Sequence, residues 1–228
     1  MVPDQTRSGK SAVCTPRERG KDGLLTSSVN SEHHSAPVWS FQGTAQVATV
    51  AEGEKLERQA LAGERRILGP EDPLTLQTMT NLGFILNGRG YYDEAEKLAR
   101  EAIEIGTRSL GPESAQVLQA TRILSVALFN QGRYAEDERG SRHLLDVERR
   151  VLGPDHPDTV NVMDDLANAI ADQGRLAEAE QAYRDALAAT QRVLRLEHPS
   201  TALVMSNLAV ILMEEGHLAD SEKLTREA

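Results

Sequence analysis

The 228-residue sequence contains one cysteine, Cys14, and few aromatic residues, which make up 4% of the chain. A single cysteine excludes an intramolecular disulfide, and no group of Cys and His residues has the spacing of a zinc site. No apolar run approaches the ~18 residues of a membrane span, and no signal-peptide core follows the N-terminal Met. These absences predict a soluble, cytoplasmic protein.

Positive charge is also scarce, because 25 Lys and Arg residues stand against 35 Asp and Glu residues, which gives a net charge of −10. Residues 1–48 hold five basic and four acidic residues, so the acidity lies in the remainder. An acidic protein repels nucleic-acid phosphates and anionic lipid headgroups. The charge therefore predicts neither nucleic acid nor membrane as a partner.

Residues 1–48 are rich in Ser, Thr, Gly, Pro and charge and show no sustained hydrophobic period. Such a segment cannot bury enough apolar surface to offset its conformational entropy. We predict a disordered N-terminal tail over residues 1–48.

Beyond this tail the chain repeats with a step of 42 residues. Gly69–Pro73 recurs at Gly111–Ala115 and Gly153–Pro157, with a decayed copy at Arg195–Pro199. The same step relates Leu82, Leu124, Leu166 and Leu208, and likewise Gly90, Gly132, Gly174 and Gly216. Repeats of this length are stacked supersecondary units. We predict an array over residues 49–228, made of a half-repeat (49–68), repeats at about 69–110, 111–152 and 153–194, and a truncated repeat (195–228).

Each unit is predicted to form two helices. The first begins near the proline, where Asp72, Ser114 and His156 occupy the capping place, and it ends at the glycine in a left-handed conformation. The second runs, for example, from Leu176 to about Leu194. On the second helices Glu precedes Arg by four, as in Glu96 and Arg100, which predicts exposed intrahelical pairs worth ~0.2–0.5 kcal/mol that contact no ligand.

Small residues are expected where the helices cross, because larger ones would force them apart. They occupy two registers: Gly83, Ser125, Ala167 and Ala209 on the first helices, and Ala95, Asp137, Ala179 and Ser221 on the second. Asp137 is the exception, and it predicts a looser crossing in its unit.

The Leu-then-small pairs, such as Leu82-Gly83 and Leu166-Ala167, together with Ala95 and Ala179, resemble the tetratricopeptide repeat family over roughly residues 50–228. The linker Leu152–Thr159 and the 42-residue step are similar to the kinesin light chain form. This resemblance implies an all-α, right-handed superhelical solenoid of antiparallel helix pairs that acts as a non-catalytic protein-interaction scaffold. Residues 1–48 lack the heptad coiled coil of kinesin light chains, so no link to a motor is predicted.

The resemblance also implies that the first helices line a concave groove that binds extended peptides. The residues carried over are Gln77, Thr80, Asn81, Phe84, Gln119, Arg122, Val126, Asn161, Asp164, Asp165, Asn168, Leu203, Ser206 and Asn207. Amide side chains suit this role because they both donate to and accept from a peptide backbone. Arg122 is the single basic residue of the set, so a clamp for a terminal carboxylate is not predicted. Asp164 and Asp165 favour a basic peptide residue near the middle.

We find no pattern of a catalytic site. Ser8–Ser11 resembles the end of a phosphate-binding loop, but Asp4 stands where that loop needs glycine. Asp164 and Asp165 are adjacent on a helix and point about 100° apart, so they do not form an acid/base pair. His33-His34, His156 and His198 suit polar loops and caps better than metal ligation. We therefore predict no enzyme activity, no small-molecule substrate, no metal and no cofactor.

Neither end of the array carries an evident polar cap, although solenoid ends normally need one. A fragment of a longer protein is the favoured explanation, with a truncated gene product and end-to-end self-association as the alternatives. The alternative function is a sensor or assembly region of a larger signalling protein whose nucleotide-switch domain is not present in this sequence.

Overall fold

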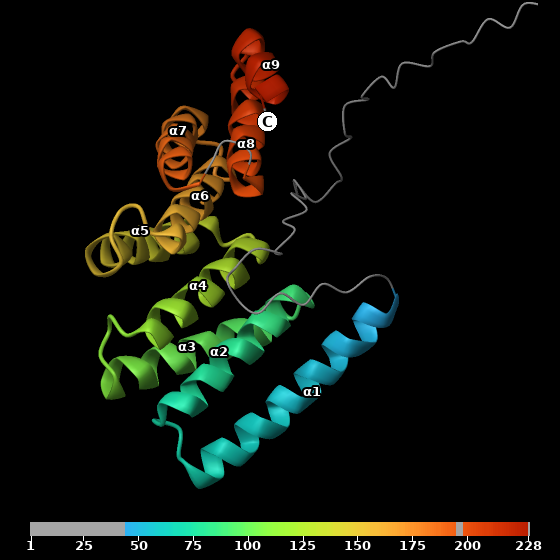
Figure 1. The fold of residues 1–228 in the computed structure, drawn as a ribbon, viewed down its shortest axis with the longest axis vertical. Helices are drawn as coiled ribbons and strands as arrows, with labels where there is room; N and C mark the ends of the chain where they lie inside the picture. The colour runs from blue at the N-terminus through green and yellow to red at the C-terminus, as the bar shows by residue number, and fades with distance from the viewer. Residues whose placement is uncertain (1–43, 195–197, 228) are drawn as a thin grey trace, which may run out of the picture. The chain divides into compact units, whose positions relative to one another are not determined.

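The computed structural model describes residues 44–194 and 198–227, and within these ranges all regular secondary structure is helical (Figure 1). The helices are α1 (Thr44–Ile67), α2 (Pro73–Gly88), α3 (Tyr92–Ser109), α4 (Ala115–Asn130), α5 (Tyr134–Val151), α6 (Pro157–Ala171), α7 (Leu176–Val193), α8 (Pro199–Glu214) and α9 (Leu218–Glu227). They belong to one compact unit, Ser40–Ala228. None of the described helices is both long enough and apolar enough to cross a membrane.

The first helix begins within the segment expected to be a tail. Most of that segment, residues 1–43, lies outside the described residues, but α1 starts at Thr44, five residues before the predicted boundary. Residues 44–50 contain neither glycine nor proline, the two residues that most strongly oppose a helix. The helix therefore continues upstream of the half-repeat.

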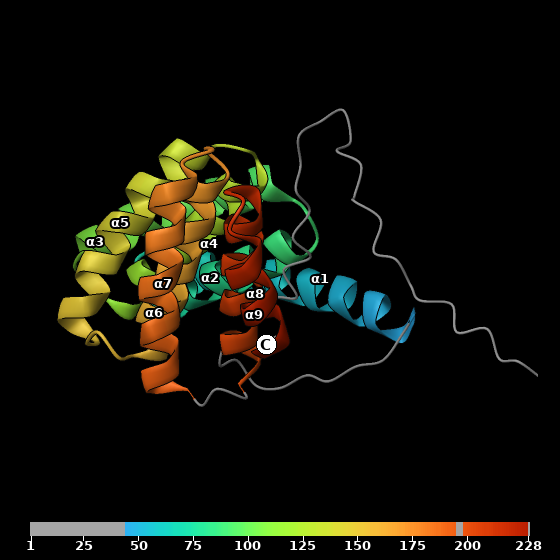
Figure 2. The same cartoon turned by 90° about the horizontal axis from the view of Figure 1, so that it is seen from above.

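Neighbouring helices in the sequence are also neighbours in space, and Figures 1 and 2 show them stacked in chain order. Pairs α2/α3, α4/α5, α6/α7 and α8/α9 form the repeats, and the second helix of each pair packs on the first helix of the next. The helix α1 packs on α2 as the second helix of the half-repeat. The fold is an all-α solenoid of the kind that the 42-residue step predicts.

The predicted starts of the first helices are confirmed, and three of the four capping side chains accept a hydrogen bond from the backbone. The Asp72 side chain accepts a hydrogen bond from the Leu74 N–H at 2.9 Å. Nδ1 of His156 and Nδ1 of His198 each accept one at 3.2 Å from the N–H two residues later. Ser114 also occupies its predicted capping position, at the start of α4, although its side chain makes no capping hydrogen bond.

The predicted left-handed glycines are present after every first helix. Gly90, Gly132, Gly174 and Gly216 have φ between 76° and 85°, a region that other residues rarely adopt. After the first of them, the Tyr91 N–H bonds back to the Leu86 carbonyl at 2.9 Å. This turn directs the residues on either side of the glycine toward the second helix of the preceding unit, a geometry that matters below.

Gly83 lies where α2 and α4 meet. A Cβ atom added to it would stand 2.9 Å from Cγ2 of Ile123, closer than real contacts allow. By contrast, a Cβ added to Gly63 in α1 would meet nothing within 4 Å. Glycine at position 83 therefore permits the close approach of two successive first helices.

We expect Gly63→Ala to stabilise the protein by up to about 1 kcal/mol, because alanine is the better helix former. Gly83→Ala gains the same propensity but must displace Ile123, so its net effect is expected to be neutral or destabilising. Urea unfolding followed by circular dichroism measures the difference. Equal stabilisation by the two substitutions would contradict this account of Gly83.

Asp137, expected to loosen its helix crossing, is buried within a polar cluster. Its carboxylate accepts hydrogen bonds from the hydroxyls of Ser125 and Ser141, the second at 3.0 Å. Burial raises the pKa of Asp137 to about 6, although the two serines act in the opposite direction. The crossing is therefore filled by hydrogen-bonded side chains rather than by the alanine of the neighbouring units.

Candidate protein-binding face

The predicted groove residues of α2 and α4 hydrogen-bond to one another. Nε2 of Gln77 donates to Oδ1 of Asn81 at 3.0 Å and to Oε1 of Gln119 at 3.3 Å. Thr80 donates to Gln119 at 3.2 Å but is itself buried, which removes it from the surface open to a ligand. Asn81 is exposed and Gln77 and Gln119 are half-buried, so these amides form a polar surface across two helices.

Exposed apolar side chains lie beside this polar surface. Phe84 on α2 and Val126 on α4 occupy one repeat register and are 47% and 41% exposed. In the same register α6 has Asn168, and α8 has the exposed Val210. Leu203 of α8 is also exposed. The first helices therefore offer apolar contacts on either side of a polar α6.

Arg122 is held by carboxylates of its own chain. Its guanidinium lies 3.1 Å from Glu148 and 2.8 Å from Asp158. The Glu148 carboxylate is fully buried, and its ion pair with Arg122 lacks hydrogen-bond geometry. Burial raises the pKa of Glu148, and Arg122 counteracts this effect. The structure thus assigns Arg122 a local charge-balancing role that the sequence did not reveal, with its side chain only 18% exposed.

Asp164 is tied into a network between α6, α7 and α8. Its carboxylate accepts weak hydrogen bonds at 3.4 Å from Nδ2 of Asn168 and Nδ2 of Asn207. The Tyr183 hydroxyl donates to Oδ1 of Asn168 at 2.7 Å. Burial raises the pKa of Asp164 to about 6, and the two amides lower it. Three predicted groove residues are therefore brought together here, with Tyr183 as a support that the repeat pattern did not indicate.

Asp165 is different, because its side chain has no hydrogen bond or ion pair among the described contacts. It is half-buried on α6. Burial raises its pKa to about 8, the charges of Asp164, Asp137 and Glu148 add to this rise, and Arg122 opposes it. An acidic side chain in an acidic environment is stabilised by an added positive charge.

The remaining predicted residues are available to a ligand but less distinctive. Asn161 is half-buried on α6, one turn before Asp164 and Asp165. Ser206 is exposed on α8 and donates to the Ala202 carbonyl at 2.8 Å. These residues extend the polar surface, but as uncharged side chains they do not require a charged partner.

The Glu222–Arg226 pair is exposed, as the spacing predicts, but the glutamates of the other Glu–Arg pairs are largely buried. Each intrahelical pair is present, but Glu96, for example, is only 16% exposed and also binds Arg133 of the next unit at 2.7 Å. Arg100 in turn reaches Glu136 at 2.5 Å. Burial opposes ionisation of Glu96, yet hydrogen bonds from Arg133 and Arg100 hold its pKa at about 2. Glu54, Glu96 and Glu138 therefore join successive repeats, an effect that the spacing within one helix cannot reveal.

A stack of helix pairs with a polar and apolar face on its first helices is the architecture of a repeat-type protein-interaction scaffold. The tetratricopeptide repeat family matches residues 75–116 in one form and residues 116–191 and 163–228 in another. The chain belongs to this family. No curated protein sequence matches it.

Solved structures with the same fold include kinesin-light-chain-like repeats. A putative kinesin light chain of Podosopora anserina with nearly identical TPR-like repeats is 24% identical, with 80% of this chain and 86% of that chain covered and a TM-score of 0.70. BtubC (BKLC) from P. vanneervenii is 18% identical, with 80% and 72% covered and a TM-score of 0.71. The apo form of RapI is 11% identical, with 78% and 62% covered and a TM-score of 0.67. At these identities the likeness concerns the fold.

Proposed function

We propose that this protein-interaction scaffold binds an extended peptide segment along α2, α4, α6 and α8 and places a basic peptide side chain against Asp165. The single observation that carries the proposal is the unpaired Asp165 among Asp164, Asp137 and Glu148. A lysine or arginine of the peptide would lower this raised pKa, so that Asp165 gives up its proton and pairs with the peptide's charge. Members of this family are typically binding modules without catalytic activity.

The apolar residues suggest the pattern of the peptide on either side of its basic residue. Phe84 and Val126 lie toward the N-terminal helices, and Leu203 and Val210 lie on α8. Because α6 stands between these helices in chain order, an extended segment that crosses it would meet apolar, acidic and apolar positions in turn. We infer a target of the pattern apolar–basic–apolar.

The amides on the same face would bind the peptide backbone. Asn81 is exposed and Gln119 is half-buried, and an amide both donates and accepts. A charge-assisted hydrogen bond contributes about 1.5–3 kcal/mol, whereas a neutral one contributes about 0.5–1.5 kcal/mol. Preference among peptides should therefore depend mainly on the charge opposite Asp165.

Matched fluorescent peptides test this proposal. We expect a peptide with arginine between two apolar residues to bind at least ten times more tightly than the same peptide with glutamate, in fluorescence anisotropy at low salt. Added salt should reduce the difference, because screening weakens exposed charge interactions. Equal affinity for the two peptides would overturn the proposed role of Asp165, and a peptide with norleucine at the centre is the uncharged control.

A further inference from the structure

The ladder of ion pairs changes its chemistry at the last junction between repeats. In each earlier junction, a glutamate on a second helix binds an arginine four residues later and a second arginine from the following turn. For Glu138 these are Arg142 at 2.8 Å and Arg175 at 2.6 Å, and Gln173 adds a hydrogen bond at 2.8 Å. Gln173 and Arg175 flank Gly174, whose left-handed conformation directs them toward Glu138.

At the last junction the same positions hold different residues. One 42-residue step beyond Glu138 lies Glu180, and beyond Gln173 and Arg175 lie Glu215 and His217. Gly216 keeps the left-handed turn, with φ of 85°. An acidic residue thus replaces the glutamine, and an imidazole replaces the second arginine.

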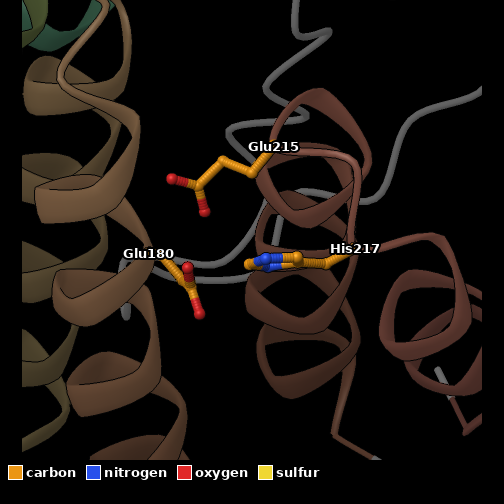
Figure 3. A group of neighbouring side chains, drawn as sticks. All are labelled: Glu180, Glu215 and His217. Atoms are coloured by element: carbon orange, nitrogen blue, oxygen red, sulfur yellow. The ribbon is translucent and has the colours of Figure 1, made fainter.

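These three side chains converge on one point. Figure 3 shows Glu180 on α7 facing Glu215 and His217 from the turn between α8 and α9. One ligand atom from each lies within 4.8 Å of the others. Oε2 of Glu215 is buried and has no hydrogen-bond partner. The carboxylate of Glu180 raises the pKa of Glu215, with burial as the second cause.

The charges around Glu138 and around Glu180 differ. Around Glu138, two arginines face two carboxylates, because Arg142 and Arg175 also pair with Glu178. Around Glu180, two carboxylates face one arginine, Arg184, which pairs with Glu180 at 2.6 Å. The last junction therefore lacks an arginine that the earlier one has, and a bound cation would supply positive charge in its place.

We propose that Glu180, Glu215 and His217 bind a divalent transition-metal ion of the Zn²⁺ type, which replaces the missing arginine and joins α7 to the α8–α9 turn. Imidazole nitrogen and carboxylate oxygen are both ligands of Zn²⁺, and water can occupy the remaining position. Ligand atoms around tetrahedral Zn²⁺ at ~2.1 Å lie about 3.4 Å apart, so a modest closure of the present arrangement suffices. Nitrogen ligation disfavours Mg²⁺ and Ca²⁺, which prefer oxygen alone.

Isothermal titration of the full chain with ZnCl₂ tests the site. The matched control is the double variant Glu215→Gln/His217→Arg, which rebuilds the junction with the residues found at positions 173 and 175. We expect the variant to lose one equivalent of bound Zn²⁺, or at least tenfold in affinity at that site. Zn²⁺ should also raise the Tm of the parent chain by a few degrees and leave that of the variant unchanged.

Unchanged Zn²⁺ binding in the variant would overturn the proposal and place the ion elsewhere, for example at His33-His34. Failure of the parent chain to bind Zn²⁺ at 100-fold molar excess would also overturn it and leave a proton shared between Glu180 and Glu215. Circular dichroism checks that the double variant is folded. If it is not, His217→Arg alone carries the same comparison, because that substitution restores only the arginine found at positions 133 and 175.

Discussion

Replacing Asp165 with asparagine is expected to raise the free energy of unfolding by about 2 kcal/mol at pH 8. The raised pKa of Asp165, about 8 in the fold, means that ionising it costs folding free energy, at about 1.4 kcal/mol per pH unit of difference. Asp165 is partly exposed, so solvent screening reduces the full difference to this smaller figure. Asparagine occupies the same register at Asn81 and Asn207, which indicates that the backbone accepts it.

The dependence on pH distinguishes this mechanism from a general packing effect. The unfolded chain releases the Asp165 proton near pH 3.8, whereas the folded protein keeps it until about pH 8. Between these values the folded state binds more protons, so its stability falls as pH rises. Glu96 acts in the opposite sense, because its folded pKa of about 2 lies below the ordinary 4.5, and its stabilisation is lost as pH falls through that range.

Thermal melts between about pH 2 and pH 9 measure these two effects. The parent chain should be most stable at about pH 4, between the acid loss from Glu96 and the loss on the basic side. Asp165→Asn should flatten the basic side of the profile and leave the acid side unchanged. A parallel shift of the whole profile would contradict the proposed ionisation.

The same substitution is expected to weaken binding of the arginine-centred peptide by about tenfold to a hundredfold, the loss of one charge-assisted hydrogen bond. A variant that is more stable yet binds more weakly would identify Asp165 as a carboxyl that is costly to ionise in the free protein but pairs with the peptide's arginine. The control is Ser206→Ala, an exposed position on the same face that should change neither stability nor the preference for arginine. If Asp165→Asn bound the arginine-centred peptide with undiminished affinity, the acidic environment of Asp165 would have no role in peptide binding.

Much of the fold could be predicted from the 42-residue step, because helix boundaries depend on local chemistry. The prolines, the capping residues and the left-handed glycines act within a few residues, and the start of α2 and the turn at Gly90 follow from them. The start of α1 could not be placed, because no stop signal separates Thr44 from residue 49.

The candidate binding face was harder to predict from the sequence than the fold, because it depends on contacts between repeats. Arg122 was assigned to the groove as its single cation, but its partner Glu148 lies on a different helix and no repeat pattern joins them. The exchange of Gln173 and Arg175 for Glu215 and His217 is visible in the sequence. The consequence of this exchange could not be predicted, because only the stacking of the repeats places Glu180 opposite Glu215 and His217.

Replacing Arg122 with threonine is expected to cost about 3–5 kcal/mol at pH 7, the largest loss among these predictions, because it leaves the fully buried Glu148 without its cation. Asp165 would lose the same nearby positive charge. At pH 5 the loss should be smaller, since Glu148, whose pKa is already raised, then takes up a proton in place of the ion pair. Urea unfolding followed by circular dichroism at the two pH values measures the effect.

The double variant Arg122→Thr/Glu148→Thr decides whether the loss comes from the unpaired carboxylate or from the arginine itself. Both threonines exist at these registers in neighbouring units, as Thr80 and Thr190, and Thr190 bonds its own helix through the Ala186 carbonyl at 2.8 Å. Removing both charges should therefore return the stability to within about 1 kcal/mol of the parent chain. If the double variant also kept its preference for the arginine-centred peptide, Arg122 would act in folding alone; if it were no more stable than Arg122→Thr, burial of Glu148 would not be the cause of the loss.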